Sequence, residues 1–135
     1  MKKIIAFLFF ILTLFSCTPK EVSSPDVSEI IKVESVVFPT TFTKDVVSTI
    51  SINYVLPTSC HKFTKFQYLK IGNTRTVAVE TSKSTTAACN PSTSVATDVL
   101  SFKPTELGVF YFRFLKGKDA AGVDIYFEFY ATVTN

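Results

Sequence analysis

Three cysteines and a single histidine are the residues of this chain whose chemistry depends most on their surroundings. Cys60 and His61 are adjacent, and Cys89 follows later. Two thiols can form one disulfide, or the three side chains can bind a metal ion. A closed structural zinc site takes four ligands, and this set supplies three. The residue types therefore favour a Cys60–Cys89 disulfide over a metal site, provided that the chain reaches an oxidising compartment.

The N-terminal residues indicate that the chain leaves the cytoplasm. Lys2 and Lys3 precede residues 4–15, which are almost entirely apolar. A basic start followed by a short apolar stretch is the layout of an export signal. The stretch is shorter than the roughly 20 apolar residues that a transmembrane helix needs. We therefore expect residues 1–16 to be a signal peptide that is removed.

The residues at the end of this segment indicate the kind of export signal. Leu14-Phe15-Ser16-Cys17 resembles the lipobox of bacterial lipoproteins. The resemblance implies that the Cys17 thiol receives a diacylglyceryl group, that the chain is cut before it, and that a fatty acid such as palmitate acylates the new amine. Several acyl chains anchor a protein stably. We expect a lipid-anchored protein of the bacterial cell envelope, in the outer membrane, on its periplasmic or surface face. The alternative is ordinary secretion with Cys17 as a free thiol.

Charge and length limit what the mature chain can be. Loss of Lys2 and Lys3 would leave 12 basic and 11 acidic side chains, without a basic stripe. This balance argues against a nucleic-acid partner. Residues 18–29 are polar, contain two prolines and show no periodicity. Residues 17–29 are therefore predicted to be a lipidated cysteine and flexible tether, followed by one domain over residues 30–135.

The residues of that domain form short runs rich in Val, Ile, Thr, Phe and Tyr, separated by turn residues. Such runs are typical of an all-β sandwich, and no window of helical period competes with them. We predict seven strands, over residues 30–38, 46–56, 63–71, 74–81, 96–102, 108–115 and 123–133. The third run changes phase midway, which indicates a β-bulge. Gly72 and Asn73 predict a tight hairpin turn after it.

Alternation within these runs predicts the core. Side chains at every second position share one face of a strand. The chain has 14 phenylalanines and no tryptophan, so phenylalanine rings must fill the space between the sheets. The predicted core residues are Ile50, Ile52, Tyr54, Leu56, Phe110, Phe112, Phe114, Ile125, Phe127, Phe129, Ala131 and Val133.

Four motifs are spaced along residues 45–133: Cys60-His61-x-Phe63, Gly72-Asn73-Thr74-x-x-Val77-x-Val79, Cys89 and Leu107-Gly108-x-Phe110-x-Phe112. Together they resemble small immunoglobulin-like domains of secreted bacterial proteins and lipoproteins. The resemblance implies an immunoglobulin-like antiparallel β-sandwich of about seven strands with one disulfide. It implies nothing about an activity.

The inventory of catalytic residues is poor. His61 is the only histidine and has no nucleophile motif beside it, so we expect a partly exposed residue that caps a strand or turn. Glu106, Asp119, Asp124 and Glu128 are scattered, and none forms a pair suited to acid–base catalysis. Calcium and phosphate loops are also missing from the sequence. We expect a protein that is not an enzyme, without a cofactor or metal.

Two surfaces are candidates for binding. If the last two strands pair as a hairpin, the positions opposite the phenylalanines project together, and Tyr and Arg there favour contact with a protein or a glycan. These residues are Tyr111, Arg113, Tyr126, Glu128 and Tyr130. The alternative is that they serve only cross-strand packing. The second candidate is the polar loop over residues 82–94, which contains Cys89. The hypothesis is that this loop acts as the wedge of a protease or lysozyme inhibitor.

Overall fold

The computed structural model describes residues 26–85 and 87–135. The predicted signal peptide, the predicted lipidation site Cys17 and most of the predicted tether lie outside these residues. The described residues form nine strands and no helix. The strands are β1 (Val27–Ile31), β2 (Val33–Val37), β3 (Thr41–Thr43), β4 (Ser48–Leu56), β5 (His61–Ile71), β6 (Thr74–Lys83), β7 (Ser94–Phe102), β8 (Gly108–Lys118) and β9 (Asp124–Thr134).

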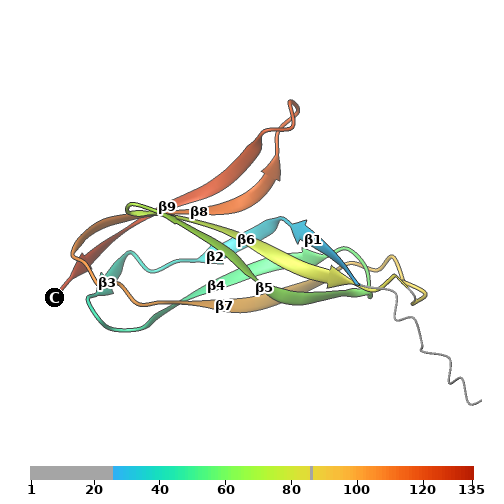
Figure 1. Ribbon diagram of the computed structural model, residues 1–135, viewed down its shortest axis with the longest axis horizontal. Coiled ribbons are helices and arrows are strands. Elements are labelled where there is room, and N and C mark those ends of the chain that lie inside the picture. Colours follow the sequence, from blue (N-terminus) through green and yellow to red (C-terminus); the bar gives the residue numbers. More distant parts are fainter. Residues whose placement is uncertain (1–25, 86) are drawn as a thin grey trace, which may run out of the picture.

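Two sheets pack face to face as a β-sandwich (Figure 1). The smaller sheet has the order β2-β4-β7, with antiparallel neighbours. The larger sheet has the order β1-β6-β8-β9-β3, and β5 pairs with β6 along its length. β8 and β1 pair with successive parts of β6, β8 in parallel and β1 antiparallel. β3 runs parallel to β9. The prediction of an all-β sandwich is confirmed.

The strand boundaries follow the prediction except near the N-terminus. The predicted strand over residues 30–38 is divided at Lys32, because β1 joins the larger sheet and β2 the smaller one. β1 also begins at Val27, inside the predicted tether, because its first residues pair with the end of β6. The short strand β3 was not predicted. The bulge in β5 is confirmed by a register shift between Phe63 and Lys65.

Phenylalanine rings occupy the centre of the core, as predicted. Phe112 is fully buried, and its ring centroid lies between 5.0 and 6.2 Å from those of four other rings. These neighbours are Phe38, Phe42, Phe102 and Phe114. Buried members of the predicted core are Ile50, Ile52, Tyr54, Phe110, Phe112, Phe114, Ala131 and Val133. Tyr54 donates a hydrogen bond to Asp98 through its hydroxyl.

The predicted core is wrong toward the tip of the β8–β9 hairpin. Ile125 is 38% exposed, and Phe127 and Phe129 are only partly buried, as is Leu56 at the end of β4. The distal part of the hairpin projects away from the rest of the sandwich (Figure 1). Residues on that part alternate as a strand requires, but no second sheet covers their apolar face completely.

Candidate binding surface

The β8–β9 hairpin places the predicted binding residues opposite one another. Tyr111 pairs with Tyr130, Arg113 with Glu128, and Leu115 with Tyr126. Directly opposed residues of antiparallel strands project to the same face of the sheet. The intervening positions carry phenylalanines that face the core. The alternation of the two strands therefore separates a core face from an outer face.

The five predicted side chains form two contacting groups on that outer face. The rings of Tyr111 and Tyr130 lie 4.9 Å apart, edge to face. Arg113 Nε donates to Glu128 Oε1 at 3.2 Å, and its guanidinium carbon lies 4.1 Å from the centre of the Tyr126 ring. We call these five residues the tyrosine patch. Sequence alternation predicted all of its members, and the structure brings them together.

The tyrosine patch is open to solvent. Tyr111 is 45% and Tyr130 58% exposed, and a shallow hollow of about 290 Å³ lies between them and Thr74 of β6. An exposed ion pair contributes about 0–1 kcal/mol and an exposed cation–π contact about 0.5–1 kcal/mol. The contacts therefore add little to folding. They restrict the rotamers of Arg113 and Glu128 beside two exposed rings, which lowers the entropy that a partner would have to remove.

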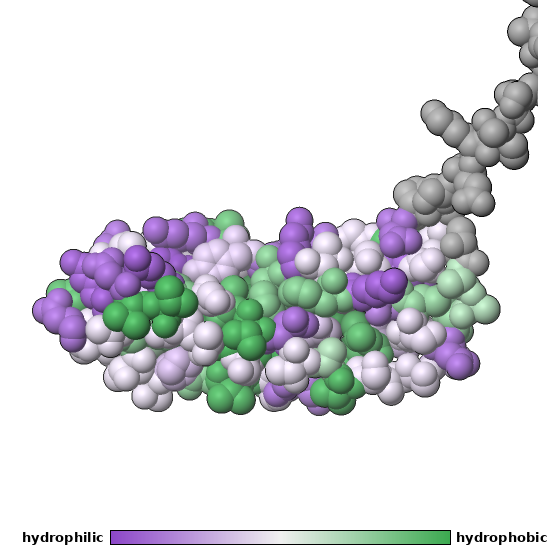
Figure 2. Space-filling model, turned by 90° about the horizontal axis from the view of Figure 1, so that it is seen from below, coloured by the Kyte–Doolittle hydropathy of each residue, from purple (hydrophilic) through white to green (hydrophobic). Residues whose placement is uncertain are grey.

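Other strands also expose apolar side chains, but without such contacts. Leu69 and Ile71 of β5 are 55% and 66% exposed, and Val95 and Val99 of β7 are 72% and 53% exposed. Figure 2 views the molecule from below and shows apolar residues in separate groups between polar ones. Single exposed apolar residues are normal on soluble domains. The tyrosine patch differs because its aromatic and charged groups are mutually ordered.

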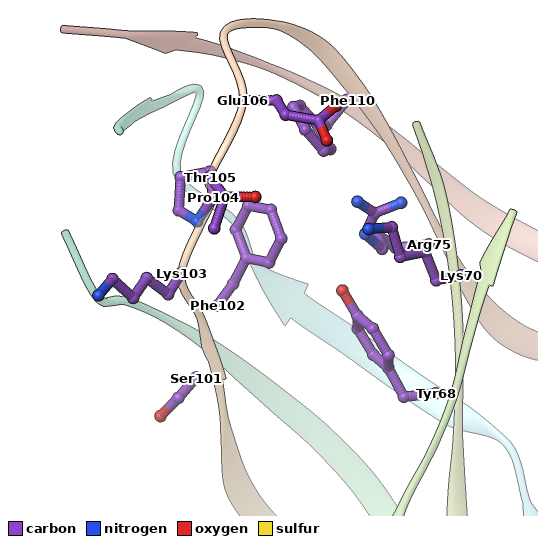
Figure 3. Close-up of a pocket in the computed structure, with 10 residues that line it drawn as sticks. All are labelled: Tyr68, Lys70, Arg75, Ser101, Phe102, Lys103, Pro104, Thr105, Glu106 and Phe110. Atoms are coloured by element: carbon purple, nitrogen blue, oxygen red, sulfur yellow. The ribbon is translucent and has the colours of Figure 1, made fainter. Parts of the chain in front are cut away.

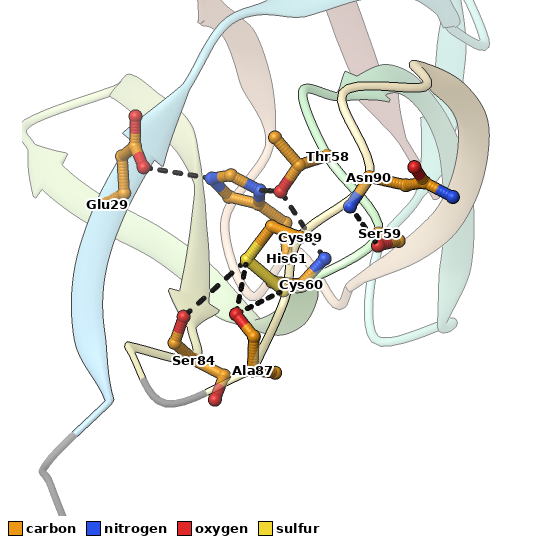
Figure 4. Close-up of a disulfide and its surroundings, with 9 residues drawn as sticks. All are labelled: Glu29, Thr58, Ser59, Cys60, His61, Ser84, Ala87, Cys89 and Asn90. Atoms are coloured by element: carbon orange, nitrogen blue, oxygen red, sulfur yellow. Dashed lines mark hydrogen bonds and ion pairs between the residues drawn. A yellow bond between two sulfur atoms is a disulfide. The ribbon is translucent and has the colours of Figure 1, made fainter.

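The second candidate, the loop over residues 82–94, is held near its middle by a Cys60–Cys89 disulfide (Figure 4). The predicted pairing is thus present. Ser59 N–H donates to Asn90 O at 3.1 Å, and Asn90 N–H donates to Ser59 Oγ at 3.0 Å. Ser84 N–H donates to Cys60 O at 3.3 Å. Both sides of the loop are therefore fastened to the turn before β5.

His61 lies beside this disulfide and is only 4% exposed, so the expectation of a partly exposed residue is wrong. Its Nε2 lies 2.9 Å from Glu29 Oε2, and its Nδ1 lies 2.8 Å from Thr58 Oγ1. A carboxylate can only accept, so we assign the proton to Nε2, and Nδ1 then accepts from the Thr58 hydroxyl. Cys60 N–H donates to the same hydroxyl at 3.3 Å. His61 thus links β1 to the turn that carries the disulfide.

Two of the scattered carboxylates, Asp119 and Asp124, make local contacts at the β8–β9 turn. Asp119 Oδ1 accepts hydrogen bonds from Ala121 and Val123 N–H at 2.8 and 2.9 Å and so orders the β8–β9 turn. Asp124 pairs with Lys118. Over residues 26–85 and 87–135, no group of three or more His, Cys, Asp or Glu side chains is arranged to hold a metal ion. The same residues include no helix long and apolar enough to cross a membrane.

Sequence reasoning missed one buried charge, that of Arg75. Arg75 is 5% exposed and lies on the inward face of β6, in alternation with Val77, Val79 and Thr81. Its guanidinium carbon lies 4.9 Å from the centre of the Phe110 ring. The alternation of β6 contained the signal, because an arginine at an inward position has to be buried or to line a cavity.

The fold and these contacts define a disulfide-linked β-sandwich with an ordered aromatic surface on one hairpin. Comparison with protein-family models, with curated proteins and with solved structures finds no match to the chain. A function therefore has to be argued from the residues and their geometry alone.

Proposed function

We propose that the chain is a lipoprotein of the bacterial cell envelope that acts as a non-catalytic binding module. It is anchored to membrane lipid through an acylated Cys17, and it contacts a protein or glycan partner through the tyrosine patch. One observation carries the binding role: five outward residues of the β8–β9 hairpin form two contacting groups on one face and are wholly or partly exposed to solvent. Tyr and Arg are the residues that most often dominate binding energies at interfaces.

The anchoring role is supported by the sequence of residues 1–17 and by the disulfide. Disulfides persist outside the cytoplasm, where an exported lipoprotein would reside. Mass spectrometry of protein from its native host tests this role, and we expect an N-terminal, acylated Cys17. A Cys17→Ser variant is expected to leave the membrane fraction. An intact Met1 terminus, or an unmodified thiol at position 17, would contradict the anchoring.

The binding role is tested by removing the two most exposed rings of the tyrosine patch. Tyr111→Ser together with Tyr130→Ser is expected to abolish crosslinking to the native partner, because each central tyrosine can contribute about 2 kcal/mol to an interface. The matched control is Val95→Ser with Val99→Ser on β7, which removes two exposed apolar residues from the other sheet. An equal loss of crosslinking in the tyrosine variant and in the valine control would contradict the proposal. Unchanged crosslinking in the tyrosine variant would also contradict it.

A second candidate function is inhibition of a protease or lysozyme through the loop over residues 82–94. The observation in its favour is that the disulfide and the Ser59–Asn90 hydrogen bonds fasten the loop near its middle to the turn before β5. A fastened loop binds with a smaller entropy loss than a free one. Nanomolar inhibition that disappears on reduction of the Cys60–Cys89 disulfide would support it. Failure to inhibit a broad panel of both enzyme classes would dismiss it.

A further inference from the structure

A cavity of about 230 Å³ lies between the two sheets, away from the tyrosine patch (Figure 3). The β5–β6 hairpin of the larger sheet forms one wall, and the end of β7 with the connection to β8 forms the other. Figure 3 shows the Tyr68 hydroxyl and the Arg75 guanidinium turned toward the same space, beside the Phe102 ring. The Lys103 side chain is turned away from it. A hydroxyl, a guanidinium and aromatic rings therefore share one small volume.

Arg75 is the buried one of the cationic residues that line this cavity, and no ion pair involving it is found in the described part of the chain. Arg75 Nη1 donates to the carbonyl oxygens of Gly72 and Thr74 at 2.7 and 3.0 Å. Carbonyl groups orient the guanidinium but carry no net charge. Within the described part of the chain, no carboxylate lies within ion-pair distance of Arg75. Buried charges in proteins are usually paired, because an unpaired one costs free energy. Arg75 is therefore a buried cation without an ion pair of its own.

The remaining donors suit a carboxylate. The two carbonyl contacts use the hydrogens of Nη1, so three N–H donors on Nε and Nη2 remain to be shared between Tyr68 and a ligand, and a side-on guanidinium edge binds a carboxylate with two parallel hydrogen bonds. Burial raises the pKa of Tyr68, and Arg75 opposes this effect by its charge and a hydrogen bond. The Tyr68 hydroxyl thus stays protonated at neutral pH and can donate as well. The Phe102 and Phe110 rings offer apolar contact beside these donors.

We propose that this cavity binds a small organic carboxylate. The carboxylate group pairs with Arg75 and accepts a hydrogen bond from Tyr68, and the apolar part of the ligand lies against Phe102 and Phe110. The apolar walls favour an organic acid over inorganic phosphate, which would leave the rings without contact. Glu106 also lines the cavity, is exposed, and disfavours an anion by its own charge. The carboxylate can belong to a free acid or to the C-terminus of a peptide.

The test is an NMR titration of the ¹⁵N-labelled full chain with benzoate, and with benzamide as an uncharged molecule of nearly the same shape. We expect saturable shifts at residues of the β5–β6 hairpin with benzoate, and at least about tenfold weaker binding of benzamide, because a charge-assisted hydrogen bond is lost. Tyr68→Phe, at a partly exposed position, is expected to weaken benzoate binding severalfold without affecting the fold. Arg75→Gln should abolish binding.

Two further variants should either strengthen benzoate binding or leave it unchanged. Glu106→Gln should strengthen benzoate binding, because it removes a negative charge from the cavity. The Tyr111→Ser, Tyr130→Ser variant should bind benzoate like the wild type, so this test is independent of the proposed partner surface.

Acetylated dipeptides with a free or an amidated C-terminus distinguish the two sources of the carboxylate, a free acid and a peptide C-terminus. Tighter binding of the free-terminus peptide than of benzoate indicates a peptide terminus, and weaker binding indicates a free acid.

Three results would overturn the proposal. One is equal binding of benzoate and benzamide, and another is unchanged benzoate binding in both Tyr68→Phe and Arg75→Gln. The third is tighter binding of inorganic phosphate than of benzoate at the same residues, which would indicate a phosphate site. Since Tyr68→Phe keeps the ring and the fold, instability of Arg75→Gln would not remove the test.

Discussion

Loss of the Cys60–Cys89 disulfide is the perturbation whose effect can be worked out most fully. The two cysteines are separated by 29 positions. Cross-linking a loop of this length removes chain entropy from the unfolded state that amounts to about 3.6 kcal/mol at 25 °C. A Cys60→Ser, Cys89→Ser variant is therefore expected to lose about that free energy of unfolding, which is a several-hundredfold change in the folding equilibrium constant.

Local contacts change this value little. Cys60 is 7% exposed, and Cys89 Sγ lies 3.3 Å from Ala87 O, so a serine hydroxyl at position 89 has an acceptor nearby. The hydrogen bonds between Ser59 and Asn90 remain in the variant and keep the loop near its place when folded. The entropy of the unfolded chain therefore dominates. Small domains have about 5–15 kcal/mol of stability, so the variant should fold but unfold at clearly lower urea concentration.

Urea unfolding followed by circular dichroism measures the difference. The wild type, the wild type under reducing conditions and the double variant are compared, and the last two should agree. Ser59→Ala is the matched control, because it removes one hydrogen bond at the same turn and leaves the disulfide, with an expected loss of about 1 kcal/mol. A loss below about 1 kcal/mol in the double variant would refute the loop-entropy argument. So would a loss no larger than that of the control.

Three further predictions concern the core, a buried hydroxyl and a turn. Phe112→Ala should cost about 3–5 kcal/mol in thermal unfolding, whereas Ile125→Ala near the hairpin tip should cost less than about 1 kcal/mol. Burial, and then the hydrogen bond and charge of Asp98, raise the pKa of Tyr54 above its usual 10.0. Above pH 10 the folded state thus keeps a proton that the unfolded state loses, so the contribution of Tyr54 to stability should be constant below this pH and fall above it. Urea unfolding at different pH values should show a smaller fall in Tyr54→Phe. Gly72 has a φ of 54° with open space around its missing Cβ, so Gly72→Ala should cost about 1–2 kcal/mol through backbone strain alone, measurable by thermal unfolding.

Sequence alternation predicted individual strands better than it predicted their partners. Ile31 and Val33 are both buried at alternate positions, so the residues around Lys32 look like one continuous strand. The division arises because β1 pairs with β6 and β2 pairs with β4, and these contacts join distant parts of the chain. The period of a strand reports which face is apolar, but not which sheet covers it. Ile125 was assigned to the core for the same reason.

The tyrosine patch was predictable because its two strands are neighbours in sequence. A hairpin fixes the register of β8 and β9 locally, so outward positions on one strand meet outward positions on the other. The surroundings of Arg75 were not predictable in the same way. Its alternation with Val77 and Val79 marks an inward position, but the cavity in front of it is formed by Phe102 of the other sheet.

His61 shows how a long-range contact alters the interpretation of a residue. Its partner Glu29 lies on β1, at a position that was expected to belong to the tether. If the chain is anchored upstream as proposed, a mechanical force between the anchor and the domain is transmitted through β1. β1 is held by its pairing with β6 and by the His61–Glu29 contact, and the disulfide lies immediately beside this contact.

Replacing His61 should therefore loosen β1 before the rest of the sandwich. His61→Ala removes two hydrogen bonds and leaves a buried space, and we expect a loss of about 2–3 kcal/mol. Hydrogen exchange of the β1 amides should accelerate more than that of β4 amides, because local opening of β1 no longer breaks the contact with the disulfide turn. Glu29→Gln is the matched control, since its amide oxygen can still accept from Nε2 and exchange should change little. Equal acceleration in β1 and β4 would mean that His61 stabilises the sandwich as a whole and does not fasten its first strand.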